Sequence, residues 1–393
     1  MKRFIHIADL HAASEKLEKF EESMNQLINY TLHHAVEAIF IAGDVFDSKQ
    51  SFAGNSGVPS VLYDLKELSE NVQYIFITKG NNAHDNPGSI SLLHQLEPNI
   101  YAYEYPVVLG IYKQAPEGFE FENVVDILRN EVPGKADYII SLVPYPTKAM
   151  FVSEDSIDNN NAEFIVRFEQ VFELIGDVTK EYDCPKFLAF HGNVVGSRLN
   201  SGQTLVSQDI MVAPSTLQKA KADYYALGHI HLRQEILPNM LYSGPIYNKN
   251  WGEIEQTSFE VIEVENGVIT HHPEMFISSR PMIAITANFK DGHFVFGENI
   301  TPNLSNQYRL KISVPENERT LITDDKINEL KQKYGEDARI DLTVIPIERE
   351  SRSETIMTCT SLADEVKEYA STIGVNLETT VFEKLNLLQE AAE

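Results

Sequence analysis

Short apolar runs separated by amphipathic stretches dominate the first two-thirds of the sequence. Apolar runs of about four to eight residues bounded by turn residues are typical of buried strands. Six such runs are FIHIA (4–8), AIFIAG (38–43), VQYIFIT (72–78), YIISLVPY (138–145), KFLAFHG (186–192) and DYYALGH (223–229). Between the first two, apolar residues recur close to helical spacing, which predicts a helix over residues 15–35. Its one buried face would carry Leu17, Phe20, Met24, Leu27 and Leu32. Strands that alternate with helices predict an α/β domain.

The pattern changes after about residue 275 and predicts a second, smaller module. PMIAITANF, QYRLKISV and ARIDLTVIPI resemble strands, and DDKINELKQKYG resembles a helix. The polar residues 348–360 predict a linker. We therefore expect an α/β domain over residues 1–275, a small α+β domain over 276–350, and a linker followed by helices over 351–393.

Two short amphipathic helices are predicted at the end of the sequence. Each has one apolar face, and Gly374 is a suitable stop for the first. Such helices either dock on their own domain or bind a partner, and the pattern leaves both readings open. The apolar positions are Leu362, Val366, Tyr369 and Ile373 in the first helix and Val381, Leu385 and Leu388 in the second.

Composition excludes several classes of protein. No apolar run approaches the roughly 18 residues that would span a bilayer. The first residues, MKRFIHIADLH, enter a strand pattern directly and lack the apolar core of a cleavable signal. The chain has 2 cysteines, Cys184 and Cys359, which make a disulfide framework or a cysteine zinc site implausible. We expect a cytoplasmic protein without a membrane segment.

The charge balance is strongly acidic. The chain has 32 basic and 58 acidic residues, for a formal net charge of −26. Such a surface repels the phosphate backbone of nucleic acids. If nucleic acid is the substrate, bound cations or a partner protein must supply the attraction.

Polar clusters lie at the carboxyl ends of five of the predicted strands, where open α/β sheets bind ligands. Each cluster alone is a weak signal, but their conjunction in this order favours a metal centre. His229 and His231 are the strongest pair, because two histidines two residues apart share one face of an extended segment. The clusters are Asp9-Leu10-His11, Gly43 to Asp47, Gly80 to Asp85, His191-Gly192 and Gly228 to His231.

This set of side chains suits two divalent cations. A two-metal centre, with ions about 3.5–4 Å apart, needs a bridging carboxylate, further imidazole or carboxylate ligands, and open positions for water and substrate. Nitrogen and oxygen ligands without thiolate suit manganese, iron or zinc. Two dications would also create a strong positive field inside an acidic protein.

The ordered motifs DxH, GDxxD, GN…HD, H and GHxH resemble those of the calcineurin-like metallophosphoesterase superfamily. Within it, the chain resembles the SbcD/Mre-eleven nuclease family through MKRFIHIADLH, GDVFD, and YSGPIYNKNWGE after GHIH. The resemblance extends loosely over the small module, which is similar to that family's DNA-capping domain, and over the tail. It implies a four-layer β-sandwich flanked by helices, with a small α+β cap and a helical tail.

The resemblance also implies metal-binding roles. Asp44 would bridge two metal ions. The remaining ligands would be Asp9, His11 and His231 for one ion, and Asn81, His191 and His229 for the other.

One motif departs from the family pattern. The family's histidine directly follows the asparagine and helps the leaving oxygen depart, which implies that catalytic role for His84, whereas here Asn82 and Ala83 intervene. Either the turn bulges and His84 still reaches the phosphate, or Asn82 takes over the ligand role. We expect the inserted residues to loop out, because both tolerate a bulge. Asp47 and Asp85 are expected to orient the ligands.

The resemblance implies a manganese-dependent DNA nuclease subunit, with Mg²⁺ as the alternative cofactor. It would act as a double-strand 3′–5′ exonuclease and a single-strand or hairpin endonuclease in DNA end processing, recombination, repair or replication. We expect a homodimer bound to an SbcC/Rad-fifty-type ATPase, in a bacterial cytoplasm or in a host cytoplasm if the chain is phage-encoded. The rival readings are a phosphoesterase acting on small nucleotides or phosphoproteins, and an inactive scaffold for the ATPase.

Overall fold

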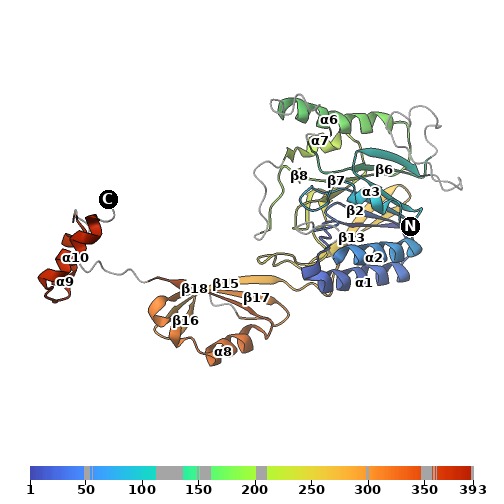
Figure 1. The fold of residues 1–393 in the computed structure, drawn as a ribbon. Coiled ribbons are helices and arrows are strands. Elements are labelled where there is room, and N and C mark those ends of the chain that lie inside the picture. The colour runs from blue at the N-terminus through green and yellow to red at the C-terminus, as the bar shows by residue number, and fades with distance from the viewer. Residues whose placement is uncertain are drawn as a thin grey trace. The chain divides into compact units, whose positions relative to one another are not determined.

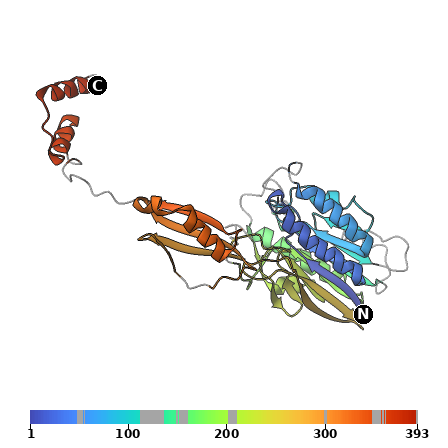
Figure 2. The same ribbon diagram turned by 90° about the horizontal axis from the view of Figure 1, so that it is seen from below.

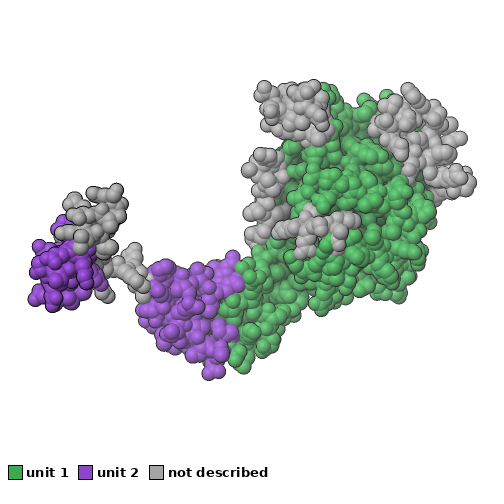
Figure 3. All heavy atoms as spheres, in the orientation of Figure 1, with its two compact units in different colours: residues 1–285, 299–310, 328–340 green, residues 286–298, 311–327, 341–393 purple. Residues whose placement is uncertain are grey.

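The structure is a computed structural model in which the chain divides into two compact units (Figure 3). Unit 1 contains residues 1–285, 299–310 and 328–340, and unit 2 contains residues 286–298, 311–327 and 341–393. The residues that the structure describes are 1–47, 54, 56–111, 136–147, 150, 161–200, 210–297, 301–346, 356, 359 and 361–390.

The first three predicted strands lie side by side in a six-stranded sheet. The strand order is β14-β13-β1-β2-β3-β4, with β1 to β4 parallel and β13 antiparallel to both β1 and β14. The sequence pattern did not reveal the β13–β14 hairpin. The strands are β1 (Lys2–Ile7), β2 (Val36–Ala42), β3 (Val72–Thr78), β4 (Ile100–Tyr103), β13 (Ser258–Glu265) and β14 (Val268–Met275).

The other three predicted strands form the centre of a second six-stranded sheet, ordered β11-β12-β10-β7-β6-β5. Strands β6, β7, β10 and β12 are parallel, and β5 and β11 are antiparallel edge strands. The short strands β8 (Asn193–Val194) and β9 (Met211–Val212) pair separately. The sheet consists of β5 (Val107–Ile111), β6 (Tyr138–Val143), β7 (Lys186–His191), β10 (Tyr224–Gly228), β11 (Gln234–Leu237) and β12 (Met240–Tyr242).

Aromatic side chains fill the space between the two sheets. The ring centroid of Phe187 on β7 lies 4.7 Å from Phe4 on β1 and 5.3 Å from Phe40 on β2. Phe40 also lies 5.7 Å from Phe76 on β3. All four rings are buried, so these interlocked side chains join the two sheets face to face.

Helices cover the outer face of each sheet, giving four layers (Figures 1 and 2). One hydrophobic core joins α1 and α2 to the first sheet, and a second core joins α6 and α7 to the second sheet. This arrangement confirms the predicted α/β sandwich flanked by helices. The helices of this unit are α1 (Leu17–His33), preceded by the 3-10 turn η1 (Ser14–Lys16), α2 (Gly57–Asn71), α3 (Ser89–Leu93), α6 (Asn161–Val178) and α7 (Pro214–Gln218).

The predicted helix over residues 15–35 is confirmed as α1, but one of its apolar positions was assigned wrongly. Leu32 was placed on the buried face and is 60% exposed. The buried face continues instead from Leu27 to Thr31. At 3.6 residues per turn, Leu32 lies about 100° round the helix from Thr31, which turns it toward solvent.

The predicted strands and helix after residue 275 are present in the smaller module. Its four-stranded sheet has the order β16-β15-β17-β18. Buried and exposed residues alternate along β15 and β17, so these strands have one covered face and one open face. The predicted domain limits at 275 and 350 stay predictions. The elements are β15 (Met282–Lys290), β16 (His293–Phe296), β17 (Gln307–Pro315), η4 (Glu316–Leu321), α8 (Asp324–Tyr334) and β18 (Arg339–Ile345).

Both predicted tail helices form, as α9 (Leu362–Thr372) and α10 (Thr379–Glu390). The Ser361 hydroxyl caps α9 by accepting the Asp364 N–H at 3.1 Å, and Gly374 follows the helix with a φ of 71°. Of the predicted linker 348–360, all but residues 356 and 359 lie outside the described residues. None of the described helices has both the length and the apolar character needed to cross a membrane.

We expect Phe40→Ala to lower the free energy of unfolding by about 3–5 kcal/mol, because it leaves a cavity between the sheets. Denaturant titration followed by circular dichroism measures this loss. The matched control is Leu32→Ala at the exposed position of α1, where the expected change is about 0.5 kcal/mol or less. Equal losses in the two variants would contradict the assignment of Phe40 to the core.

Candidate metal centre

The loops after β1 and β2 are joined by main-chain hydrogen bonds. The Asp9 N–H donates to the Gly43 carbonyl at 3.0 Å, and the His11 N–H donates to the Asp44 carbonyl at 2.9 Å. In the second sheet, the Gly192 N–H similarly donates to the Gly228 carbonyl at 3.1 Å. These bonds bring the DxH and GDxxD motifs together at the strand ends of the first sheet. They likewise bring His191 and the GHxH motif together at the strand ends of the second sheet.

Backbone strain is concentrated at these motifs. Asp9, His11, Asp44 and His229 have φ values of 53°, 44°, 51° and 106°. They are four of the seven non-glycine residues with positive φ in the described part of the chain. Strained conformations of this kind persist where the surrounding structure enforces them, and they cluster at functional sites.

Two glycines allow the motifs to approach closely. A Cβ atom on Gly80 would lie 2.0 Å from Asp44 Oδ1, and one on Gly228 would lie 1.9 Å from the Ala42 carbonyl oxygen. Neither position has room for a side chain, so glycine is required where β3 and β10 end against the loop after β2.

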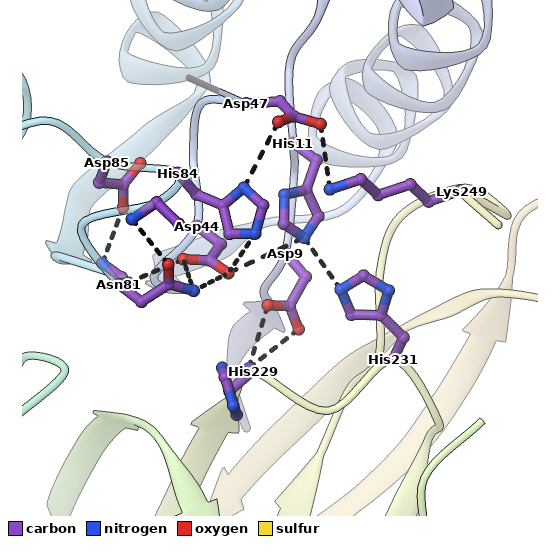
Figure 4. A network of polar contacts seen from close by, with 12 residues as sticks. Asp9, His11, Asp44, Asp47, Asn81, His84, Asp85, His229, His231 and Lys249 are labelled. Carbon is purple, nitrogen blue, oxygen red and sulfur yellow. Dashed lines mark hydrogen bonds and ion pairs between the residues drawn. The ribbon is translucent and has the colours of Figure 1, made fainter. Parts of the chain in front are cut away.

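Asp9, His11 and His231 form one ligand group, with one donor atom of each within 4.8 Å of the others. His11 Nε2 lies 2.9 Å from His231 Nε2, so the two imidazoles point at the same space (Figure 4). The Asp9 carboxylate also accepts the His229 N–H, at 3.0 and 3.1 Å. All three side chains are buried, as expected of residues that hold an ion rather than face solvent.

Asp44, His191 and His229 form the second group. His191 Nε2 lies 3.3 Å from Asp44 Oδ1, while the other Asp44 oxygen lies 3.9 Å from His11 Nε2 of the first group. Asp44 therefore lies between the two groups, at the position predicted for a bridging ligand.

Asn81 lies against Asp44. Its main-chain N–H donates to Asp44 Oδ1 at 2.9 Å, and its Nδ2 lies 3.1 Å from Oδ2. The side-chain oxygen of Asn81 instead accepts the Ala83 N–H at 2.9 Å. In this orientation the amide nitrogen faces Asp44, so ligation through the oxygen requires rotation of the amide group. The Asn82 side chain accepts a hydrogen bond from Lys79 instead of contacting Asp44.

His84 reaches the centre despite the two inserted residues. Its ring centroid is 4.4 Å from that of His11, and its Nε2 is 3.9 Å from Asp44 Oδ2. Asn82 and Ala83 are exposed, so the insertion loops outward as predicted. One potential ligand atom of each of His84, His11 and Asp44 lies within 4.8 Å of the others, so these three side chains could also hold an ion.

Asp47 and Asp85 flank the centre and contact residues that build it. Asp47 lies 3.5 Å from His84 Nδ1 and 3.0 Å from Lys249 Nζ. Burial opposes ionisation of Asp47, but His84 and Lys249 lower its pKa. The buried Asp85 accepts the N–H groups of Gly80 and Phe46 at 2.7 and 3.0 Å, which ties the β3 loop to the β2 loop. Burial and the neighbouring Asp44 raise the pKa of Asp85 to about 7.

The sequence reasoning missed Glu253. This buried carboxylate lies 3.1 Å from His231 Nδ1 and also accepts from Lys249 N at 2.5 Å and Asn250 Nδ2 at 2.8 Å. Burial opposes ionisation, but the hydrogen bond and charge of His231 lower the pKa of Glu253. A proton held on His231 Nδ1 directs the Nε2 lone pair into the centre. The available signal was the position of Glu253 at the end of YSGPIYNKNWGE.

The arrangement of lone pairs fits bound cations. His191 Nδ1 lies 2.6 Å from the Ala42 carbonyl oxygen, so a proton there leaves the Nε2 lone pair facing the Asp44 carboxylate. Burial holds the pKa of His11 well below its usual value, which favours the neutral imidazole that metals bind. For His191, burial opposes the charged form, but Asp44 raises the pKa to about 9. A cation would take the place of that proton.

The calcineurin-like phosphoesterase family (Metallophos) matches residues 2–233, more than half of the chain. The protein therefore belongs to the calcineurin-like phosphoesterases, and its buried His/Asp cluster is compatible with divalent metal ions. Among solved structures, GAP50, the anchor in the inner membrane complex of Plasmodium, aligns with 12% identity and a TM-score of 0.45. That alignment covers 89% of this chain and 99% of the other, and its low TM-score carries no conclusion about function.

We expect Asp44→Asn to weaken both metal sites, because it removes the negative charge that lies between the two groups. The loss of affinity should exceed the roughly 10–100-fold typical of an outer hydrogen-bond partner. Calorimetric titration with Mn²⁺ and elemental analysis measure affinity and stoichiometry. Asp177→Asn, an exposed position on α6, is the control. Two tightly bound equivalents of manganese in Asp44→Asn would rule out the bridging role.

Proposed function

We propose that this phosphoesterase is the nuclease subunit of an SbcCD-like complex that hydrolyses DNA phosphodiester bonds. The observation that carries the proposal is the pair of ligand groups with Asp44 between them and the His84 imidazole beside Asp44. Two divalent cations would polarise the phosphate and activate the attacking water. Mn²⁺ is the proposed ion, and Mg²⁺ is the alternative.

The chain's own residues support a proton-transfer role for His84. The imidazole lies beside the buried Asp44, but its own side chain is partly exposed, so it can reach a bound phosphodiester. Asp47 beside Nδ1 favours a proton on that nitrogen and orients the ring. Lys249 holds the other oxygen of Asp47, which limits its movement. His84 would give a proton from Nε2 to the departing oxygen and regain it from water.

The exposed apolar tail supports an ATPase partner, and the acidic charge of the chain calls for a source of positive charge if DNA is the substrate. A net charge of −26 opposes DNA binding unless cations or a second protein supply positive charge. Leu362, Tyr369 and Ile373 of the first tail segment are 42%, 45% and 44% exposed, an apolar surface that a coiled coil could cover. We propose that α9 and α10 bind an SbcC/Rad-fifty-type ATPase and that the nuclease acts as a cytoplasmic homodimer in DNA end processing.

The family match also supports a phosphoesterase that acts on small nucleotides or phosphoproteins. The scaffold reading has less support. It was motivated by the interrupted GNHD motif, yet the insertion loops outward and His84 remains beside Asp44.

The test is incubation of the purified protein, with Mn²⁺ and separately with Mg²⁺, on labelled duplex DNA, hairpin DNA and p-nitrophenyl esters. The proposal expects metal-dependent cleavage of duplex ends and hairpins. Cleavage of the small esters alone would favour the small-substrate phosphoesterase. No cleavage of any substrate by protein shown to contain two metal equivalents would favour the scaffold.

We expect His84→Ala to lower turnover by roughly 10²–10⁴-fold, the usual cost of losing a proton donor, while metal content stays intact. Steady-state kinetics and elemental analysis measure the two quantities. His33→Ala at the exposed end of α1 is the control and should behave as wild type. If His84→Ala loses one metal equivalent, His84 is a ligand of the group that contains His11 and Asp44.

We expect deletion of residues 355–393 to abolish co-purification with the ATPase, because it removes α9 and α10. Metal-dependent hydrolysis of small esters by the isolated subunit should survive. Pull-down with the ATPase and an esterase assay measure these outcomes. Unfolding of residues 1–275 in the truncated protein would instead support docking of the helices on their own domain.

A further inference from the structure

Asn82 and Ala83 are accommodated in a single tight turn. The Asn81 carbonyl accepts the N–H groups of His84 at 3.0 Å and Asp85 at 2.9 Å. The Asn81 side chain closes the turn by accepting the Ala83 N–H. These bonds are local and Asn82 and Ala83 are exposed, so the buried side chain of Asp85 anchors only the end of the turn. Segments with few buried contacts open easily, and the position of His84 therefore depends on what fixes this turn.

Lys79 is a rigid neighbour at the start of the loop. Its N–H donates to the Tyr103 carbonyl of β4 at 3.0 Å, and its carbonyl accepts the Tyr145 N–H at 3.0 Å. These bonds fix the Lys79 main chain between the ends of β4 and β6. The residue is 4% exposed, so its long side chain runs through the protein rather than into solvent.

The Lys79 ammonium donates a hydrogen bond to Asn82 Oδ1. A buried ammonium is unfavourable without an acceptor, so this bond stabilises the closed turn relative to an open one. The insertion thus supplies the acceptor for Lys79, and Lys79 supplies the anchor for the insertion. Because His84 lies two residues beyond Asn82, fixing Asn82 also limits where the imidazole can go.

We propose that Lys79 and Asn82 form a latch that holds the His84 imidazole beside Asp44. Both are positioning residues, since neither side chain contacts the Asp44 carboxylate in the described structure. The inference rests on the proposed proton-donor role of His84. It explains how the chain keeps that role with an asparagine and an alanine inserted into the motif.

Two other roles for the pair make different predictions. If Asn82 were a metal ligand, its loss would remove one metal equivalent. If Lys79 bound the substrate phosphate, its loss would chiefly raise KM. A latch affects the placement of the proton donor, so its loss should lower kcat and leave metal content and KM nearly unchanged.

The experiment compares Asn82→Ala and Lys79→Met, which break the latch, with Asn82→Asp, which keeps an acceptor for the ammonium. Two substrates are used, a DNA phosphodiester with a poor leaving group and a p-nitrophenyl phosphodiester whose leaving group needs no proton. We expect kcat on DNA to fall by about 10–100-fold in the first two variants, within the range of general acid catalysis. On the p-nitrophenyl ester it should change less than about twofold.

Controls tie the effect to His84. Asn82→Asp and the exposed α1 variant Asn29→Ala should both stay near wild type. In a His84→Ala background, Asn82→Ala should cause no further loss, because the group that it positions is gone. Equal losses on both substrates, an additive double variant, or loss of a metal equivalent would each overturn the latch.

A measurement without turnover separates this inference from the proposed function. Hydrogen exchange should be faster at the amides of residues 83–85 in Asn82→Ala and Lys79→Met than in wild type, and slow again in Asn82→Asp. If the protein cleaves small esters but not DNA, the nuclease proposal fails, and this exchange pattern still supports the latch. Unchanged exchange in Asn82→Ala overturns the latch whatever the substrate.

Discussion

The buried Asp44 carboxylate is the constraint around which the site is organised. It receives the main-chain and side-chain N–H groups of Asn81, faces His191 at 3.3 Å, and lies 3.9 Å from both His11 and His84. A buried negative charge is costly unless hydrogen bonds and positive charges compensate it. The arrangement requires a strained, left-handed backbone at Asp44. It also requires the space that glycine leaves at Gly80, next to the Asp44 carboxylate.

The aromatic core between the sheets determines how these groups meet. Asp9, Asp44 and Asn81 follow strands of the first sheet. In the second sheet, His191 is the last residue of β7 and His229 directly follows β10. The distances between these two sets therefore depend on how the sheets pack. Interlocked rings such as Phe4, Phe40 and Phe187 fill that interface at a density that allows little sliding, so the ligand geometry is preorganised.

Electrostatics connects the acidic composition with the chemistry. The centre gathers buried carboxylates, among them Asp9, Asp44 and Glu253, in a chain whose net charge is already −26. Lys249, beside Asp47, contributes a positive charge at the rim. Divalent cations would balance the remaining charge and supply a positive field for the phosphate group of a phosphoester.

The sequence by itself determined six strands of the two large sheets, three strands and the helix of the smaller module, α1, the tail helices and the five motifs at strand ends. Apolar periodicity and motif spacing predict these features because they are local properties. Leu32 shows the limit of that reasoning, since near-helical spacing did not resolve which of two adjacent residues faces the core. Only the tertiary structure showed that Glu253 contacts His231 and that the Asn81 amide nitrogen faces Asp44. It alone also showed the hydrogen bond between Lys79 and Asn82. These contacts depend on the directions in which folded loops and packed sheets point their side chains, and sequence spacing does not specify those directions.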